Sequence, residues 1–379
     1  MGTHRIAKMI LGVMISFVLF GMSYSAIGAD NIVKIGVMLE LSGRASEYGQ
    51  HNLTGIKLAV DDTNKAGGIK GAKIELVVED TGGVKTEGPP LVRKFAGRKD
   101  IVAIIGTCMS AVLIPSAPVA AELGIVMISP GSAVPWAGKF NDWTFRSTMV
   151  DSFATPILVE KIKEKWGVRT AAVIYTIDND WAVGSMKDFE KSFKDYGIKI
   201  LATEGFRGLD SDMSPQLTKI GFLNPDVLIV CALAKEAALV MHQARQKGLK
   251  CRFAGGAGLH DPSIYDLSFG AAEGTATGYP FDPSDRRPIV QNVVKKYREI
   301  YNIDPPSYVA YGYDAVVVLA DALRRIKDTS DRKALRDALG KTKGAEGVTG
   351  FFTYQNSGDN ITPGVHLFIM KGGKFVPFD

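Results

Sequence analysis

Short apolar runs rich in β-branched residues alternate along the chain with apolar positions spaced three and four residues apart. The runs predict buried strands, and the spaced positions predict amphipathic helices. In the first half, strands are expected at residues 33–39, 74–78, 101–105 and 125–128, and helices at 53–66, 89–96 and 113–123. Strands that alternate with helices in this way form a parallel sheet covered on both faces.

The alternation stops across residues 130–148 and then begins again. The second half predicts strands at 171–175, 198–203, 227–231 and 252–255, and helices at 153–166, 182–196, 213–221 and 236–248. After a Pro- and Gly-rich stretch at 278–288, helices are expected at 289–301, 308–326 and 332–339, followed by short apolar segments at 350–354 and 365–370. Because 379 residues exceed what one core usually supports, the pattern predicts an α/β fold with two doubly wound parallel-sheet lobes.

The first thirty residues have a different character. Arg5 and Lys8 precede an apolar run at 9–20, and small residues follow up to Ala29. This order is typical of a secretory signal peptide. The run is shorter than the roughly 20 residues that span a bilayer. We therefore expect residues 1–29 to be removed near residue 29, leaving a soluble, exported chain.

Composition narrows the class of protein. Apolar residues make up 46% and charged residues 22%, which excludes a disordered chain. The net charge of +5 is too small and too dispersed to indicate nucleic acid or a membrane surface as a partner. The three cysteines form no CxxC pair. Export would permit a Cys231–Cys251 disulfide, but their places in or beside expected strands favour buried free thiols.

The usual catalytic motifs are missing. The sequence contains no phosphate-binding loop, no HExxH zinc helix and no GxSxG nucleophile turn. Residues 178–180 lack the rest of a calcium loop, and a solvated turn is the better interpretation. His260, just beyond an expected strand, is the histidine best placed for a functional role. We expect no enzyme activity, no catalytic residue, no metal and no cofactor.

Two loops nevertheless carry small and hydroxyl residues beyond expected strand ends, where open α/β sheets bind ligands. Ser110 follows the strand at 101–105, and Gly131, Ser132 and Ala133 follow the next one. Free backbone N–H groups and hydroxyls suit a carboxylate, here without lysine or arginine. The alternative for Ser110 is an ordinary helix N-cap.

Several segments are familiar as a set. They are IGVML at 35–39, LSG at 41–43, YG at 48–49, NKAGGIKG at 64–71, AIIG at 103–106, ISP at 128–130, FRS at 145–147 and AYGYDA at 310–315. Together they resemble the branched-chain amino acid ABC-transporter binding proteins. The resemblance implies a type I periplasmic binding fold with a three-segment hinge. Its lobes would be residues 30–150 plus 281–350 and residues 151–280 plus 351–379.

The resemblance also implies ligand-binding residues. Ser110, Gly131, Ser132 and Ala133 would hold a carboxylate. The other positions carried over are Tyr48, Trp181 and Leu233 as pocket walls, Asp151 at the lobe junction, and Ala257.

Ala257 is the informative departure, because leucine-type members have at this position a glutamate that pairs with the ligand's ammonium. A buried unpaired ammonium costs several kcal/mol. The expected function is capture of a small carboxylate-bearing solute, an aromatic acid being one candidate, for membrane permease subunits of an ABC importer. A hydrophobic or branched-chain amino acid is the alternative ligand, and a ligand-sensing receptor lobe is the alternative class. A monomer is expected.

Overall fold

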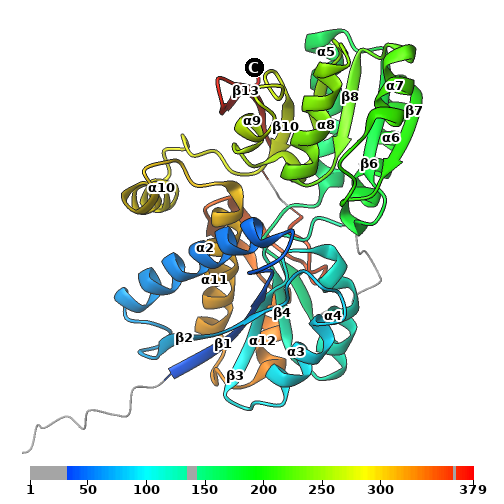
Figure 1. Ribbon diagram of the computed structural model, residues 1–379. Coiled ribbons are helices and arrows are strands. Elements are labelled where there is room, and N and C mark those ends of the chain that lie inside the picture. The colour runs from blue at the N-terminus through cyan, green and yellow to red at the C-terminus, as the bar shows by residue number, and fades with distance from the viewer. Residues whose placement is uncertain (1–31, 135–142, 362–363) are drawn as a thin grey trace, which may run out of the picture.

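The computed structural model describes residues 32–134, 143–361 and 364–379. The expected signal peptide, residues 1–29, lies outside them. The chain forms two lobes, each built on its own sheet, so the two-lobe fold is confirmed (Figure 1). In the described ranges no helix combines the length and the apolar character needed to cross a bilayer.

The N lobe contains a parallel five-stranded sheet in the order β2-β1-β3-β4-β5. Its strands are β1 (Ile32–Leu39), β2 (Lys73–Asp80), β3 (Ile101–Gly106), β4 (Val126–Ser129) and β5 (Thr144–Arg146). Its helices are α2 (Ser46–Lys65), α3 (Gly88–Ala96), α4 (Ser110–Glu122), α10 (Pro288–Tyr301), α11 (Ser307–Arg325) and α12 (Arg332–Gly340). Strands β3 and β4 are buried at every residue, as expected for strands covered on both faces. Helix α11, almost wholly buried, packs along α2 (Figure 1).

The C lobe contains a seven-stranded sheet in the order β14-β13-β10-β9-β8-β6-β7. Its strands are β6 (Thr170–Thr176), β7 (Lys199–Phe206), β8 (Val227–Cys231), β9 (Arg252–Gly255), β10 (Ala276–Tyr279), β13 (His366–Lys371) and β14 (Lys374–Pro377). Its helical segments are α5 (Asp151–Trp166), α6 (Asp180–Asp195), α7 (Ser214–Leu223), α8 (Ala234–Gln246), η1 (Ala257–Leu259) and α9 (Ile264–Leu267). Strands β6 to β10 pair in parallel, and β13 and β14 add an antiparallel edge.

Three segments connect the lobes. The first joins β5 to α5, the second joins β10 to α10, and the third follows the hairpin of β11 (Lys343–Gly347) and β12 (Gly350–Thr353). After β12 the chain still contacts the N lobe, because the Tyr354 hydroxyl donates to the Arg146 carbonyl at 2.8 Å and the Arg146 N–H donates to the Gly358 carbonyl at 3.0 Å. We therefore place the third crossing after Gly358, later than the expected boundary at residue 350.

The cysteines are buried and unbonded, as favoured from the sequence. Cys231 ends β8, and Cys251 precedes β9. The Cys231–Cys251 disulfide that export would permit is not formed.

Candidate functional site

Two loops of the N lobe meet beyond the carboxyl ends of β3 and β4. Ser110 begins α4 at the end of one loop and Ser132 lies on the other, and their hydroxyl oxygens are 2.8 Å apart. Gly131 allows this approach, because a Cβ at that position would lie 2.4 Å from the Cys108 sulfur. Both serines are buried. The paired hydroxyls form a polar spot that can donate to the oxygens of a carboxylate.

The N-cap interpretation of Ser110 is wrong. Met109 occupies the cap position of α4, and Ser110 is the first helical residue, with no side-chain cap hydrogen bond at this end of the helix. The Ser110 hydroxyl instead pairs with Ser132 on the neighbouring loop. The place of Ser110 just after a strand suits a helix cap, but its side chain points to the junction of the two loops.

Glu40, a residue that sequence reasoning missed, holds the first loop. Its carboxylate accepts the N–H groups of Cys108 at 3.0 Å and of Met109 at 3.3 Å. Burial raises the pKa of Glu40 to about 7, although these hydrogen bonds and one from Thr81 oppose the rise. The expectation that this loop offers free N–H groups to a ligand is therefore wrong at Cys108 and Met109.

Arg146 holds the second loop in the same way. Its guanidinium is fully buried and donates to the carbonyls of Ser132 at 2.8 Å and Val134 at 2.9 Å, and it forms an ion pair with Asp359 at 2.5 Å. The Ser132 N–H donates to the Ser129 hydroxyl at 3.1 Å. The two loops contain no lysine or arginine, as the sequence indicated, but Arg146 of β5 lies against the second one. A buried cation braces the second loop, and hydroxyls make up the polar spot.

Asp151 brings a buried carboxyl to the lobe junction. The Trp181 indole N–H donates to its Oδ2 at 2.9 Å. Burial raises the pKa of Asp151 to about 7, with Asp188 adding to the rise, while hydrogen bonds from Trp181 and from the Ala257 backbone oppose it. Gly256 leaves room for this carboxyl, since a Cβ there would lie 2.6 Å from Oδ2. Asp151 and Ala257, far apart in the sequence, are therefore neighbours.

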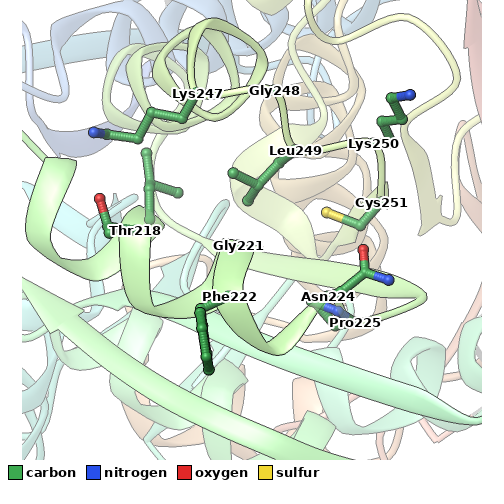
Figure 2. A pocket seen from close by; sticks show the side chains of 11 residues that line it. Thr218, Gly221, Phe222, Asn224, Pro225, Lys247, Gly248, Leu249, Lys250 and Cys251 are labelled. Atoms are coloured by element: carbon green, nitrogen blue, oxygen red, sulfur yellow. The ribbon is translucent and has the colours of Figure 1, made fainter.

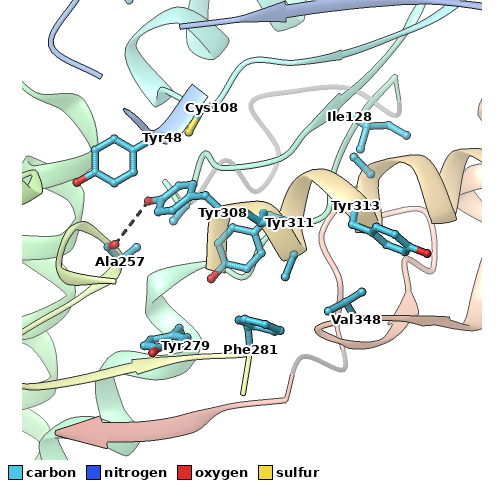
Figure 3. Packing of buried hydrophobic residues seen from close by; sticks show 14 of the residues in the cluster. Tyr48, Cys108, Ile128, Ala257, Tyr279, Phe281, Tyr308, Tyr311, Tyr313 and Val348 are labelled. Carbon is cyan, nitrogen blue, oxygen red and sulfur yellow. Dashed lines mark hydrogen bonds between the residues drawn. The ribbon is translucent and has the colours of Figure 1, made fainter. Parts of the chain in front are cut away.

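Tyr48 spans the two lobes. Its hydroxyl accepts the Ala234 N–H at 2.7 Å and donates to the Gly258 carbonyl at 3.3 Å, both in the C lobe. Its ring meets Tyr308 edge-on, with centroids 4.7 Å apart, and the Tyr308 hydroxyl donates to the Ala257 carbonyl at 3.5 Å (Figure 3). The lobes are in contact here through the Tyr48 hydroxyl, and the Tyr48 ring packs on Tyr308.

The remaining candidate wall residues belong to the same buried apolar cluster. Trp181 and Leu233 are each 7% exposed and Ala133 is 1% exposed. The Trp181 ring covers Gly258, where a Cβ would lie 2.6 Å from the ring. Leu233 occupies the N-cap position of α8, without a side-chain hydrogen bond to the helix. Trp181 contacts Asp151, and the Asp151 N–H donates to the Ala133 carbonyl at 3.4 Å, so these two positions lie beside Asp151. Leu233 immediately precedes Ala234, whose N–H the Tyr48 hydroxyl accepts.

A cavity of about 480 Å³ lies elsewhere in the C lobe, where α7 and α8 end (Figure 2). It is lined by Leu217, Thr218, Gly221, Phe222, Asn224, Pro225, Lys247, Gly248, Leu249, Lys250 and Cys251. These residues precede β8 and β9, so the cavity is at the amino ends of the strands. Ligands of open α/β sheets bind at the opposite edge. It contains none of the candidate site residues.

The polar positions considered for other chemistry have structural roles. His260 is buried, with Nε2 3.1 Å from the Gly278 carbonyl and its ring 4.1 Å from that of Tyr279, and burial lowers its pKa to about 3. Asn179 caps α6 by accepting the Ala182 N–H at 3.1 Å. Among the described residues no His, Cys, Asp and Glu side chains are grouped as a metal site requires.

Comparisons with known proteins agree with the two-lobe fold. Residues 32–373 match the family model described as periplasmic binding protein. The chain is 28% identical over 342 residues to Leu/Ile/Val-binding protein homolog 1 of Brucella suis biovar 1, covering 90% of this chain and 91% of that protein.

Two solved structures are similar throughout. A leucine-binding protein of Thermotoga maritima has a TM-score of 0.85 and 28% identity, covering 91% of this chain and 97% of that one. A branched-chain amino acid transporter substrate-binding protein of Streptococcus pneumoniae, solved with isoleucine, has a TM-score of 0.83 and 28% identity, covering 91% and 98%. The chain therefore belongs to the periplasmic binding protein family and is a solute-binding protein of the branched-chain amino acid ABC-transporter type.

Proposed function

We propose that this protein captures a small carboxylic acid that lacks an α-ammonium group, encloses it between the lobes and delivers it to the permease of an ABC importer. Export by the signal peptide at residues 1–29 is part of this proposal. The observation that carries it is the surroundings of Ala257. This residue has only a methyl group at the position where leucine-type members place a glutamate, and the nearby carboxyl already accepts hydrogen bonds from within the protein.

That carboxyl belongs to Asp151. It accepts the Trp181 indole N–H at 2.9 Å and the Ala257 N–H. Its raised pKa of about 7 means that a large share is protonated at neutral pH. A neutral carboxyl attracts an ammonium group much more weakly than an ionised glutamate does. It also repels a nearby carboxylate less. This charge state supports an acid over an amino acid.

The acid itself would bind at the polar spot. Ser110 and Ser132 supply hydroxyls 2.8 Å apart, and Arg146 places a positive charge behind the Ser132 carbonyl. Tyr48, Trp181 and other apolar residues suit a hydrocarbon or aryl body. These residues therefore suit both the carboxylate and the apolar body of such an acid.

A hydrophobic amino acid is the second candidate ligand. Relatives 28% identical are named for leucine, isoleucine and valine, and Asp151 is the carboxyl in the site that could ionise to accept an ammonium. In that case Asp151 would replace the missing glutamate at position 257, and its pKa would fall on binding.

Calorimetry at neutral pH with matched ligands tests the proposal. 4-Methyl-2-oxopentanoate is compared with leucine, and phenylpyruvate with phenylalanine, so that each pair shares one side chain. We expect each oxo acid to bind more tightly than its amino acid. Tight binding of leucine or phenylalanine, with no heat from the acids, would refute the proposal in favour of the second candidate.

Ala257→Glu should reverse the order, because a buried carboxylate repels an acid and accepts an ammonium. Ala257→Gln is the matched control, since it adds the same bulk without charge. If both variants reduce acid binding equally, space and not charge decides selectivity at position 257.

A further inference from the structure

One arginine of the N lobe reaches across to the C lobe outside the candidate site. Arg44 lies between β1 and α2, and its Nη2 and Nε are 2.6 and 3.2 Å from Glu236 Oε1. Its Nη1 is 3.9 Å from Asp178 Oδ2. Glu236 is in the first turn of α8, and Asp178 follows β6. A single cation of one lobe thus meets two carboxylates of the other.

The C lobe is shaped to receive this side chain. The Gly208 N–H donates to Asp178 Oδ1 at 3.0 Å, which leaves Oδ2 toward Arg44. A Cβ at Gly208 would lie 1.5 Å from Arg44 Nη2, so the glycine leaves room for the guanidinium in this position. The Glu236 side chain is only 10% exposed, whereas that of Arg44 is 40% exposed. Three separate segments of the C lobe therefore form one socket.

A second contact between the lobes lies beside it. Tyr48 is four residues after Arg44, and its hydroxyl accepts the Ala234 N–H at the start of α8. Glu236 is two residues further along the same helix. The first turn of α8 is therefore held by two side chains of the N lobe, one through a neutral hydrogen bond and one through an ion pair.

We propose that Arg44, Asp178 and Glu236 form a clasp, here called the Arg44 clasp, that holds the lobes closed and slows release of the bound solute. The clasp rests on the proposed function only in that a solute is enclosed. Its members belong to different lobes, so it forms only when the lobes meet, and it adds to the closed state alone. Arg44 is thus a positioning residue that sets affinity without lining the site.

Release kinetics of 4-methyl-2-oxopentanoate test the clasp. Arg44→Gln should raise the dissociation rate about two- to fivefold, as for a partly exposed ion pair, while the association rate stays within about twofold. Arg98→Gln is the matched control, because Arg98 has 38% exposure and pairs at 2.8 Å with Asp100 inside the N lobe. It should change neither rate. Equal rates for the two variants would overturn the clasp.

A double-mutant cycle tests the partner. The combination Arg44→Gln/Glu236→Gln should resemble Arg44→Gln alone, because Glu236 acts through Arg44. Glu236→Gln by itself should give most of that effect, since Asp178 Oδ2 still lies 3.9 Å from Arg44. Effects that multiply would mean that the two residues act separately, and would contradict the clasp. Thermal unfolding of each variant shows whether its fold is intact.

A distance measurement without any solute separates the clasp from the ligand proposal. Spin labels on cysteines at the exposed positions Lys57 in α2 and Lys247 after α8 report the distance between the lobes. Arg44→Gln, or raising NaCl from about 50 to about 500 mM, should shift the distribution to longer distances. If this shift occurs and the acid does not bind, the clasp stands and the proposed ligand is wrong. If the acid binds and neither distance nor rate responds to Arg44, the clasp is wrong and the proposed function stands.

Discussion

Replacing Asp151 by asparagine should abolish a proton uptake that accompanies binding of an acid. Burial raises the pKa of Asp151 from 3.8 to about 7 in the closed arrangement. A shift of about 3 units corresponds to about 4 kcal/mol in favour of the protonated form, at 1.36 kcal/mol per unit. The Trp181 N–H, at 2.9 Å, and the Ala257 N–H are not sufficient to offset this burial.

The pKa of Asp151 differs between the open and the closed arrangement of the lobes, and this difference sets the direction of the pH dependence. When the lobes are open and water reaches the carboxyl, its pKa returns toward 3.8, so closing takes up a proton between about pH 4 and pH 7. Closing is therefore most favourable below this window and weakens as pH rises through it. A bound carboxylate adds negative charge and raises the pKa of Asp151 further. Affinity for 4-methyl-2-oxopentanoate should then increase as pH falls from about 8 to about 6, by at most tenfold per pH unit.

Leucine, if it binds, should lack this pH dependence. Its ammonium would stabilise the ionised carboxyl of Asp151 and lower the pKa, so binding would take up no proton. The presence or absence of proton uptake therefore distinguishes the two candidate ligand classes.

Calorimetry in phosphate and Tris buffers at pH 7 measures the proton directly, because the observed enthalpy varies with the ionisation enthalpy of the buffer. Wild type should take up about half to one proton with the acid, and Asp151→Asn close to none. Asp314→Asn is the control: Asp314 is also buried with a pKa of about 7, and it accepts the Val348 N–H at 2.6 Å within the N lobe. Binding without proton exchange, or equal uptake in Asp151→Asn, would refute the reasoning.

Two further substitutions test the loops that form the polar spot. Ser110→Ala should weaken acid binding by about 1–3 kcal/mol in calorimetry, whereas Ser116→Ala in the same helix should not, because the Ser116 hydroxyl donates to a helix carbonyl at 2.6 Å; equal losses would place the head group elsewhere. Glu40→Gln should weaken acid binding, since an amide cannot accept the N–H groups of both Cys108 and Met109. Because the pKa of Glu40 is raised from 4.5 to about 7, the unfolding free energy of wild type should fall by up to about 3 kcal/mol as pH rises through this window. Glu40→Gln should not show this fall. Parallel pH profiles in denaturant unfolding would contradict this assignment.

The pattern of apolar positions was enough to predict the fold class. Strands such as β3 and β8 are apolar at nearly every residue because both faces of a parallel sheet are buried, so each is visible as a continuous run. The three-residue β5 and the β10 segment ATGY contain no such run. They are strands because neighbouring strands supply the hydrogen-bond partners, which is a property of the assembled sheet.

The candidate site likewise contains some residues that the sequence could predict and others that it could not. The order of residues alone pointed to Ser110 and Ser132, because ligands gather at the strand ends that the sequence reveals, whereas Asp151 was proposed only from the family resemblance. Glu40 and Arg146 were missed. Each is one charged residue beside an apolar run, and nothing in the sequence shows which loop its side chain holds.

The charge state of the site was likewise decided only by tertiary structure. Asp151 and Ala257 are 106 residues apart in the sequence and become neighbours through the fold. The pKa of Asp151 rises because other segments exclude water from its carboxyl. The sequence determines which groups are present and which sheet edge they follow. Which of them meet, and how strongly each holds its proton, depends on distances and burial that exist only once the two lobes have packed together.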